Sequence, residues 1–130
     1  MKKAYFICIG NSGRSQIAEG YAKHFGQGIL EVQSAGTKPA DRISSNAVEV
    51  MKEDDIDISS QYPKKIDFEY AKTADYVIIM GCGAENMCPA WFITKSENWD
   101  LEDPHGQNIE FYRIIRDEIK KRVLDLIENI

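Results

Sequence analysis

The spacing of hydrophobic residues changes several times along the chain, and each change marks an expected element. Residues 4–10 (AYFICIG) form a short apolar run, rich in aromatic and branched side chains, that predicts a buried strand. Over residues 15–25 the apolar side chains recur at helical spacing, and Gly26 and Gly28 then end the predicted helix. Polar and apolar residues alternate over residues 30–36, which predicts a second strand.

The second half of the chain continues to change between the two patterns. A polar cap followed by an apolar face predicts a helix over residues 44–56, and residues 68–74 predict a short third helix. Residues 74–81 (ADYVIIMG) carry the strongest strand signal, a continuous apolar run typical of a parallel sheet. Residues 82–92 predict a loop or a short helical segment, and the stretch around Trp99 predicts a short strand or turn.

The C-terminal tail predicts a long amphipathic helix from residue 109 onward. Its apolar stripe is expected to pack on the core and consists of Tyr112, Ile115, Ile119, Val123, Leu126 and Ile130. Strands and helices in this order predict a small α/β protein with a parallel sheet. Residues 1–130 are expected to form a single domain.

Composition narrows the classes of partner. Of the 130 residues, 43% are hydrophobic and 28% are charged, which is typical of a globular domain. The formal net charge of −5 argues against nucleic acid or an anionic membrane as the main partner. No apolar run approaches the roughly 18 residues of a membrane span, and the apolar start is too short for a signal peptide. We expect a cytoplasmic protein that works as a monomer without a cofactor or metal.

The turn after the first predicted strand reads CIGNSGRS, residues 8–15. A strand, a glycine-containing turn and a helix start direct backbone N–H groups to one point, where the helix dipole adds partial positive charge. This arrangement predicts a cradle for an oxyanion. Its residues are Ile9, Gly10, Asn11, Ser12, Gly13 and Arg14.

Three side chains of this turn predict chemistry beyond anion binding. The guanidinium of Arg14 offers a planar fork for two oxygens of the anion. Cys8 stands at the mouth of the cradle, where the amides and Arg14 would stabilise a thiolate, and Ser15 could donate a hydrogen bond to the sulfur. Alternatively, Cys8 is a buried core thiol and Arg14 a surface residue, or the domain is a non-catalytic module that binds oxyanions or senses redox state.

The string CIGNSGRS resembles the phosphate-binding loop of low-molecular-weight protein tyrosine phosphatases and of the arsenate reductases that share their fold. SAGT at residues 34–37 and the pair Asp103-Pro104 stand where that family has them, and WDLEDP with RIIRDEI resembles the arsenate reductase branch. The resemblance covers the whole chain. It implies a three-layer α/β/α fold with a four-stranded parallel sheet, the last strand lying around Trp99.

The resemblance also implies a general acid. An oxygen leaving group departs more easily when it is protonated, and the family supplies the proton from an aspartate that precedes a proline. That residue is Asp103 here. Read without the family, Asp103-Pro104 is a common turn sequence, and Glu102 and Asp100 are neighbouring carboxylates that do not precede the proline.

Two further cysteines, Cys82 and Cys88, follow the strongest strand. The end of that strand should bring Cys82 to the same sheet edge as Cys8. The resemblance implies a relay of disulfides from Cys8 to Cys82 and then to Cys88, with a thioredoxin-like protein as the final reductant. On this reading the protein converts arsenate to arsenite.

Other functions for these cysteines stay open. Cys82 and Cys88 could be ordinary buried thiols, or a regulatory switch on a phosphatase that hydrolyses phosphomonoesters through a cysteinyl-phosphate. They could also bind a metal, although this spacing, with both histidines remote in sequence, is a poor zinc pattern. Trp91 and Phe92 could form an apolar docking patch for the reductant or simply cover the core.

The sequence departs from the family at two informative places. The stretch after Asp103 reads Pro-His-Gly, without the tyrosines usual in the phosphatases, which weakens the case for a phosphopeptide substrate. His105 is either a solvated loop residue or a residue that tunes Asp103. Some of the reductases hold a potassium ion behind the loop. Asn11, Glu19 and Ser34 could supply part of such a site, but Lys64 and Lys65 lie where a further carboxylate is expected.

Overall fold

The computed structural model describes residues 1–80 and 88–130. Its elements follow the chain in the order β1 (Lys2–Cys8), α1 (Arg14–Phe25), β2 (Leu30–Gly36), α2 (Ser45–Lys52), α3 (Phe68–Thr73), β3 (Tyr76–Ile79), α4 (Ala90–Lys95), β4 (Glu97–Asn98) and α5 (Ile109–Glu128). Each lies within or beside a range that the hydrophobic pattern predicts. Among the described residues, none of the helices combines the length and the apolar character needed to cross a bilayer.

The four strands form one parallel sheet in the order β2-β1-β3-β4. β1 is flanked on both sides, so that Phe6 lies opposite Ser34 on β2 and Ile78 on β3. The chain therefore winds to one side of β1 and then to the other. In open α/β sheets the carboxyl ends of strands at such a reversal form the crevice where ligands bind. Here that end is occupied by Cys8.

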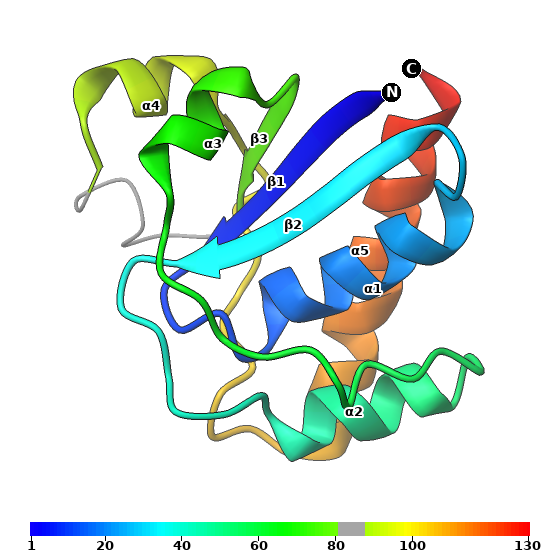
Figure 1. The fold of residues 1–130 in the computed structure, drawn as a ribbon. Coiled ribbons are helices and arrows are strands. Elements are labelled where there is room, and N and C mark those ends of the chain that lie inside the picture. The colour runs from blue at the N-terminus through cyan, green and yellow to red at the C-terminus, as the bar shows by residue number, and fades with distance from the viewer. Residues whose placement is uncertain (81–87) are drawn as a thin grey trace.

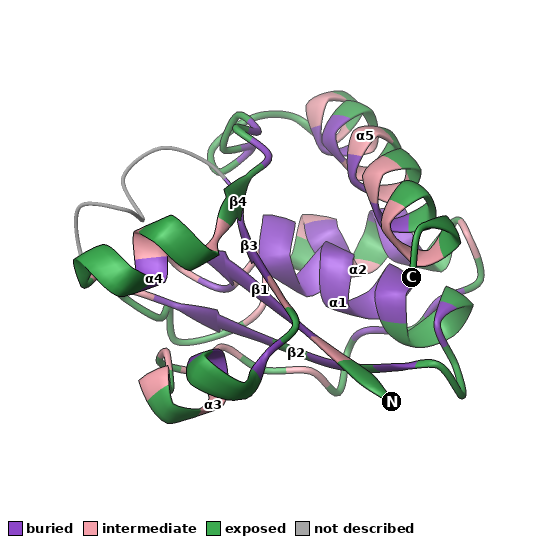
Figure 2. Ribbon diagram, turned by 90° about the horizontal axis from the view of Figure 1, so that it is seen from above, coloured by how far each residue is buried: buried purple, intermediate pink, exposed green. Residues whose placement is uncertain are grey.

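Helices cover both faces of the sheet. Figure 1 shows α1, α2 and α5 on one face and α3 and α4 on the other, and Figure 2 shows β1, β2 and β3 as a largely buried middle layer. Alternate residues of β1 face the two sides: Ala4, Phe6 and Cys8 pack in the core under α1 and α5, whereas Tyr5 and Ile7 pack in the core under α3 and α4. The predicted three-layer α/β/α architecture is confirmed.

Two details differ from the predicted elements. β4 has only two residues and ends before Trp99, because the chain bends into the loop that follows while the amide of Trp99 still bonds to the carbonyl of Ile79. The apolar stripe of α5 is buried from Tyr112 to Val123, but the helix ends at Glu128 and Ile130 is 41% exposed. The expectation that the stripe packs on the core as far as Ile130 is therefore wrong for its last residue.

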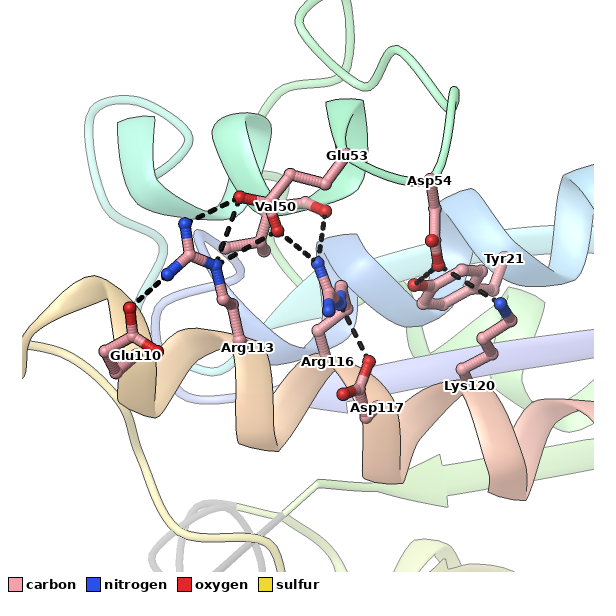
Figure 3. Close-up of polar contacts among 9 residues, drawn as sticks. All are labelled: Tyr21, Val50, Glu53, Asp54, Glu110, Arg113, Arg116, Asp117 and Lys120. Carbon is pink, nitrogen blue, oxygen red and sulfur yellow. Dashed lines mark hydrogen bonds and ion pairs between the residues drawn. The ribbon is translucent and has the colours of Figure 1, made fainter.

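Polar contacts tie α5 to the end of α2 (Figure 3). Arg113 and Arg116 on α5 both bond to the carboxylate of Glu53, and Arg116 also donates to the carbonyl oxygen of Val50. Hydrogen bonds from Arg113 and then Arg116 hold the pKa of Glu53 below its ordinary value. These contacts hold the two helices together above the sheet face that contains Cys8.

A second set of contacts in Figure 3 joins α1 to the same region. The hydroxyl of Tyr21, a fully buried residue, donates to Asp54 Oδ2 at 2.6 Å, and Lys120 Nζ lies 3.2 Å from the same oxygen. The Tyr21 bond, followed by that of Lys120, lowers the pKa of Asp54 against the opposing effect of its partial burial. Burial and the Asp54 carboxylate raise the pKa of Tyr21.

Candidate active site

Cys8 ends β1 at the carboxyl edge of the sheet and lines a cavity of about 230 Å³. The residue is only 2% exposed. Its sulfur accepts a hydrogen bond from the backbone amide of Asn11 at 3.1 Å and lies 2.8 Å from the hydroxyl oxygen of Ser15. Hydrogen bonds that point at a sulfur favour its thiolate form over its thiol form.

The backbone of the loop 9–13 is held in one orientation by the segment 37–44. Four of its carbonyl oxygens, counting that of Cys8, accept bonds from amides of this segment: Cys8 from Thr37, Ile9 from Lys38, Gly10 from Ala40 and Ser12 from Ser44. In a planar trans peptide the N–H points opposite to the C=O. The amides that follow these carbonyls therefore face away from segment 37–44, and that of Asn11 reaches the Cys8 sulfur.

The loop 9–13 lies so close to the end of β2 that residue 36 has to be a glycine. A Cβ at this position would stand 2.5 Å from the carbonyl oxygen of Ile9, closer than real Cβ atoms approach, and 3.0 Å from the Cβ of Asn11, which is tighter than most real contacts. Asn11 itself has a φ of 50°, in the left-handed region that asparagine tolerates better than most residues. The end of β2 and the loop thus fit together only because the residue between them has no side chain.

Arg14 begins α1 and is 5% exposed. Its NH1 donates to the carbonyl oxygens of Met80 and Leu101, at 3.0 and 2.8 Å, which lie just after β3 and β4. NH2 lies 3.7 Å from Asp103 Oδ2. The guanidinium is therefore anchored by one nitrogen to the ends of two strands, while its NH2 side faces the acidic loop that lines the same cavity.

Asp103 lies on the loop before α5, and its side chain is 56% exposed. Its Oδ1 accepts a hydrogen bond from the backbone amide of His105 at 3.0 Å, and the buried Pro104 separates the two residues. Both Asp103 and His105 line the Cys8 cavity. The structure therefore brings an acidic side chain to the opening of the cavity, with its backbone direction fixed by a proline and a short turn.

A chain of buried polar groups lies behind the loop. The side-chain amide of Asn11 donates to Ser15 Oγ at 2.7 Å and to Ser34 Oγ at 3.0 Å, and Ser34 donates to Glu19 Oε1 at 2.5 Å. All four residues are at most 3% exposed. Through this series of hydrogen bonds the Cys8 sulfur is connected to the carboxylate of Glu19, on the second turn of α1.

Of the two later cysteines, the structure describes only Cys88. Cys82 falls outside the described residues. Cys88 is half-buried just before α4 and packs against the core on the α3 and α4 face, together with Phe68 and Ile93. Within the described parts of the chain, no three His, Cys, Asp or Glu side chains converge on a position that could hold a metal ion.

The aromatic pair beside α3 and α4 has two distinct environments. Phe92 is fully buried and covers the core, whereas Trp91 is 38% exposed and meets the ring edges of Phe68 and Phe92. Lys72 Nζ lies 5.7 Å from the centre of the Trp91 ring. Of these two rings, therefore, only that of Trp91 presents an aromatic surface outward.

Sequence reasoning missed three residues of the site. Gln16 is fully buried and donates through its side chain to the carbonyl oxygens of Asn11 and Tyr62, so it ties the loop to a distant segment. Ala40 and Tyr112 line the cavity from segment 37–44 and from α5. None of the three carries a mark of this role in the sequence, because each reaches the site through contacts between segments that are distant along the chain.

Comparison with known proteins places the site in a family. The family model described as low molecular weight phosphotyrosine protein phosphatase matches residues 3–130. The chain is 43% identical to a glutaredoxin arsenate reductase of Synechocystis sp. (strain ATCC 27184 / PCC 6803 / Kazusa), covering 100% of this chain and 99% of the other.

Solved structures agree with this placement. An arsenate reductase in its phosphate-binding state superposes with a TM-score of 0.91 at 42% identity, covering 100% of this chain and 99% of the other. A thioredoxin-dependent arsenate reductase of Corynebacterium glutamicum superposes with a TM-score of 0.83 at 34% identity, covering 99% of this chain and 61% of the other.

Proposed function

Because the chain belongs to the low molecular weight phosphotyrosine protein phosphatase family, we propose that it is the variant of this fold that reduces arsenate to arsenite. The observation that carries the proposal is the environment of the Cys8 sulfur, which meets the Asn11 amide and the Ser15 hydroxyl in a cavity also lined by Arg14 and Asp103. A thiolate, an anion clamp and an acid within one cavity are the groups that displacement at an oxyanion requires.

The first step is attack on arsenic. The Cys8 thiolate forms a sulfur–arsenic bond, and one hydroxyl of arsenate leaves as water after taking a proton from Asp103. Arg14 and the amides of the loop 9–13 bind the remaining oxygens and stabilise their charge in the transition state. The anchoring of Arg14 NH1 on two carbonyls keeps the guanidinium in place before the anion arrives.

Electron transfer follows by thiol–disulfide exchange. The Cys82 thiolate attacks the Cys8 sulfur, the sulfur–arsenic bond breaks, and its electron pair stays on arsenic, which is reduced from As(V) to As(III) and leaves as arsenite. Cys88 then attacks Cys82, which releases Cys8 as a thiolate and leaves a Cys82–Cys88 disulfide. An external dithiol reduces that disulfide and closes the cycle.

The reductant is a dithiol protein of the thioredoxin type. Similar reductases are described as thioredoxin-dependent and as glutaredoxin-linked, so both partners are tested below. The exposed ring of Trp91, three residues after Cys88 in the sequence, is the surface that we assign to this partner. We further propose that one chain suffices for the reaction, and that it works in the reducing cytoplasm, where such dithiols are kept reduced.

A second candidate function uses the same cavity without the later cysteines. Cys8, Arg14 and Asp103 would suffice to hydrolyse a phosphomonoester through a cysteinyl-phosphate, since phosphate and arsenate share shape and charge. The family name and the family's solved phosphatases favour retaining this activity as a side reaction. It requires no electron donor, and this difference separates the two functions.

The test is arsenite production in a coupled assay. The protein is supplied with arsenate, NADPH and either thioredoxin with thioredoxin reductase, or glutaredoxin with glutathione and glutathione reductase. We expect repeated turnover with at least one of these systems. The variant Cys82→Ser should lose multiple-turnover reduction and keep hydrolysis of p-nitrophenyl phosphate. Reduction that survives in Cys82→Ser would contradict the relay, and absence of arsenite with both systems would contradict the function.

A further inference from the structure

Glu19 is a buried carboxylate behind the Cys8 loop, and two lysines neutralise it. The residue is 3% exposed. Lys23 Nζ lies 2.5 Å from its Oε2, and Lys64 Nζ lies 3.6 Å from its Oε1, the oxygen that also accepts the Ser34 hydroxyl. A charge removed from water needs such partners, because an unpaired buried carboxylate is strongly unfavourable.

Lys64 also fixes the orientation of Asn11. The backbone amide of Lys64 donates to Asn11 Oδ1 at 2.8 Å. A backbone N–H can only donate, so this bond identifies the oxygen of the Asn11 side chain and leaves its NH₂ group to point the other way. That NH₂ group donates to Ser15 and to Ser34.

The direction of every later bond follows from that orientation. Ser34 accepts from Asn11 and therefore uses its single hydrogen toward Glu19, which can only accept. Ser15 also accepts from Asn11, so its single hydrogen is available to the Cys8 sulfur, 2.8 Å away. This series of hydrogen bonds thus ends on an acceptor at each side, the Glu19 carboxylate and the Cys8 sulfur.

A monovalent cation does not fit beside Glu19 in this chain. Asn11 Oδ1 is already bonded to the Lys64 amide, and Glu19 Oε1 is shared by the Ser34 hydroxyl and the Lys64 ammonium. A cation placed between these oxygens would meet the positive charge of Lys64 at close range. Of the two lysines, Lys64 is the less exposed, with 26% of its side chain exposed against 52% for Lys23.

We infer that Lys64 is a positioning residue for the Cys8 nucleophile: its amide orients Asn11, and its ammonium group supplies beside Glu19 the positive charge that a bound potassium ion would otherwise supply. The inference rests on the proposed role of Cys8. The backbone amide of Lys64 thereby sets the direction of the Ser15 hydrogen bond to the sulfur, and its side chain balances the buried charge of Glu19, although Lys64 touches neither substrate nor sulfur. It also makes the protein independent of potassium.

The first experiment measures the reactivity of Cys8 directly. In a chain carrying Cys82→Ser and Cys88→Ser, Cys8 is the only thiol, and its alkylation by iodoacetamide is followed across pH. Below the midpoint of the profile, Lys64→Met should lower the rate about three- to tenfold, because less of the sulfur is thiolate. Lys64→Arg should restore most of the rate. Lys65→Met, which removes an exposed neighbouring ammonium, should leave it unchanged.

Each outcome of this profile has a distinct meaning. If Cys8 in the parent chain reacts only as an ordinary thiol, the proposed nucleophile role fails. If Cys8 is activated and Lys64→Met leaves its profile unchanged, only the role of Lys64 is overturned. Urea unfolding of each variant checks the fold, and Lys64→Gln provides a second uncharged side chain should Lys64→Met not fold.

The second experiment compares salts at equal ionic strength. Thermal unfolding and the alkylation profile of the parent chain should be the same in potassium, sodium and tetramethylammonium chloride. The variant Lys64→Asp exchanges the ammonium for a carboxylate and should gain a stabilisation specific to potassium, seen as a higher unfolding temperature. Potassium-specific stabilisation of the parent chain, or none in a folded Lys64→Asp variant, would overturn the inference.

Discussion

Cys8 and Cys88 pack against opposite faces of the parallel sheet. The side chain of Cys8 belongs to the core under α1 and α5, and Cys88 packs against the core under α3 and α4. A disulfide needs Cα atoms within about 7 Å, a condition that two cysteines on either side of a sheet do not meet without rearrangement. In the proposed relay, Cys82 therefore has to carry the oxidation from Cys8 to Cys88.

Because Cys8 and Cys88 lie on opposite faces of the sheet, we expect that they do not form a disulfide directly with each other. After Cys82→Ser has reacted with arsenate in the absence of a reductant, peptide mapping should find no direct Cys8–Cys88 disulfide. The parent chain treated in the same way should yield the Cys82–Cys88 disulfide. A Cys8–Cys88 disulfide in the Cys82→Ser variant would show that Cys88 can replace the intermediate thiol.

Asp103 should act through proton donation. Asp103→Asn keeps the size of the side chain but removes the proton, and we expect the rate of the Cys8 step to fall about 10²- to 10⁴-fold. Hydrolysis of p-nitrophenyl phosphate and single-turnover arsenite release measure this step. The matched control is Glu102→Gln, an exposed neighbouring carboxylate, which should retain the parent rate. Equal losses in both variants would indicate a general effect of loop charge.

Gly36 should tolerate no side chain. In Gly36→Ala the new methyl group would meet the Ile9 carbonyl oxygen and Asn11, so we expect a loss of about 1–3 kcal/mol in the free energy of unfolding and weaker binding of phosphate. Urea unfolding and phosphate protection of Cys8 from alkylation measure the two effects. Gly13→Ala serves as the stability control, because a Cβ there meets no atom within 4 Å. A Gly36→Ala variant as stable as Gly13→Ala would contradict the close fit.

The Tyr21–Asp54 bond should make stability depend on pH. Tyr21→Phe should cost about 1–2 kcal/mol near neutral pH, since it removes a hydrogen bond to a charged acceptor. The pKa of Asp54 is lowered from 3.8, so its contribution is present above that value and is lost as pH falls through the lowered pKa. The pKa of Tyr21 is raised from 10.0, so its contribution is lost only above that value.

The corresponding measurement is urea unfolding of the parent chain and Tyr21→Phe across pH. The difference in free energy should be constant between about pH 5 and 9 and should shrink below about pH 4. Tyr62→Phe, which removes the hydroxyl of a tyrosine that is 65% exposed, should show little difference at any pH. A difference between the parent chain and Tyr21→Phe that grows on acidification would contradict the assigned bond.

The local sequence was sufficient to predict the site where a single segment contains both the strand-to-helix turn and the functional residues. The loop 9–13 lies between a strand and a helix that are both strongly patterned, so the positions of Cys8, Arg14 and Ser15 follow from their order along the chain. The prediction that Asp103 is the general acid required the family resemblance, because an Asp-Pro pair by itself predicts only a turn. The short β4 was predicted only approximately, since two residues carry too little pattern to fix a boundary.

Contacts between distant segments could not be read from the pattern. Lys64 reaches Asn11 and Glu19 because the segment after α2 bonds to the end of β2 at Gly36, beside the loop. The resemblance drew attention to residues 64 and 65, but the sequence gives no sign that Lys64 contacts these two partners. The same holds for Arg113 and Glu53, whose contact depends on how α5 crosses α2. Burial of Gln16 likewise became visible only when the helix was placed against the sheet.

The central claim is tested most directly by a single turnover without external reductant. The fully reduced parent chain, mixed with excess arsenate and quenched, should release one arsenite per chain and carry the Cys82–Cys88 disulfide. Cys88→Ser should also release one arsenite but should stop at a Cys8–Cys82 disulfide, and Cys8→Ser should release none. Arsenite from Cys8→Ser, or a parent chain that releases none while its three thiols remain reduced, would contradict the account.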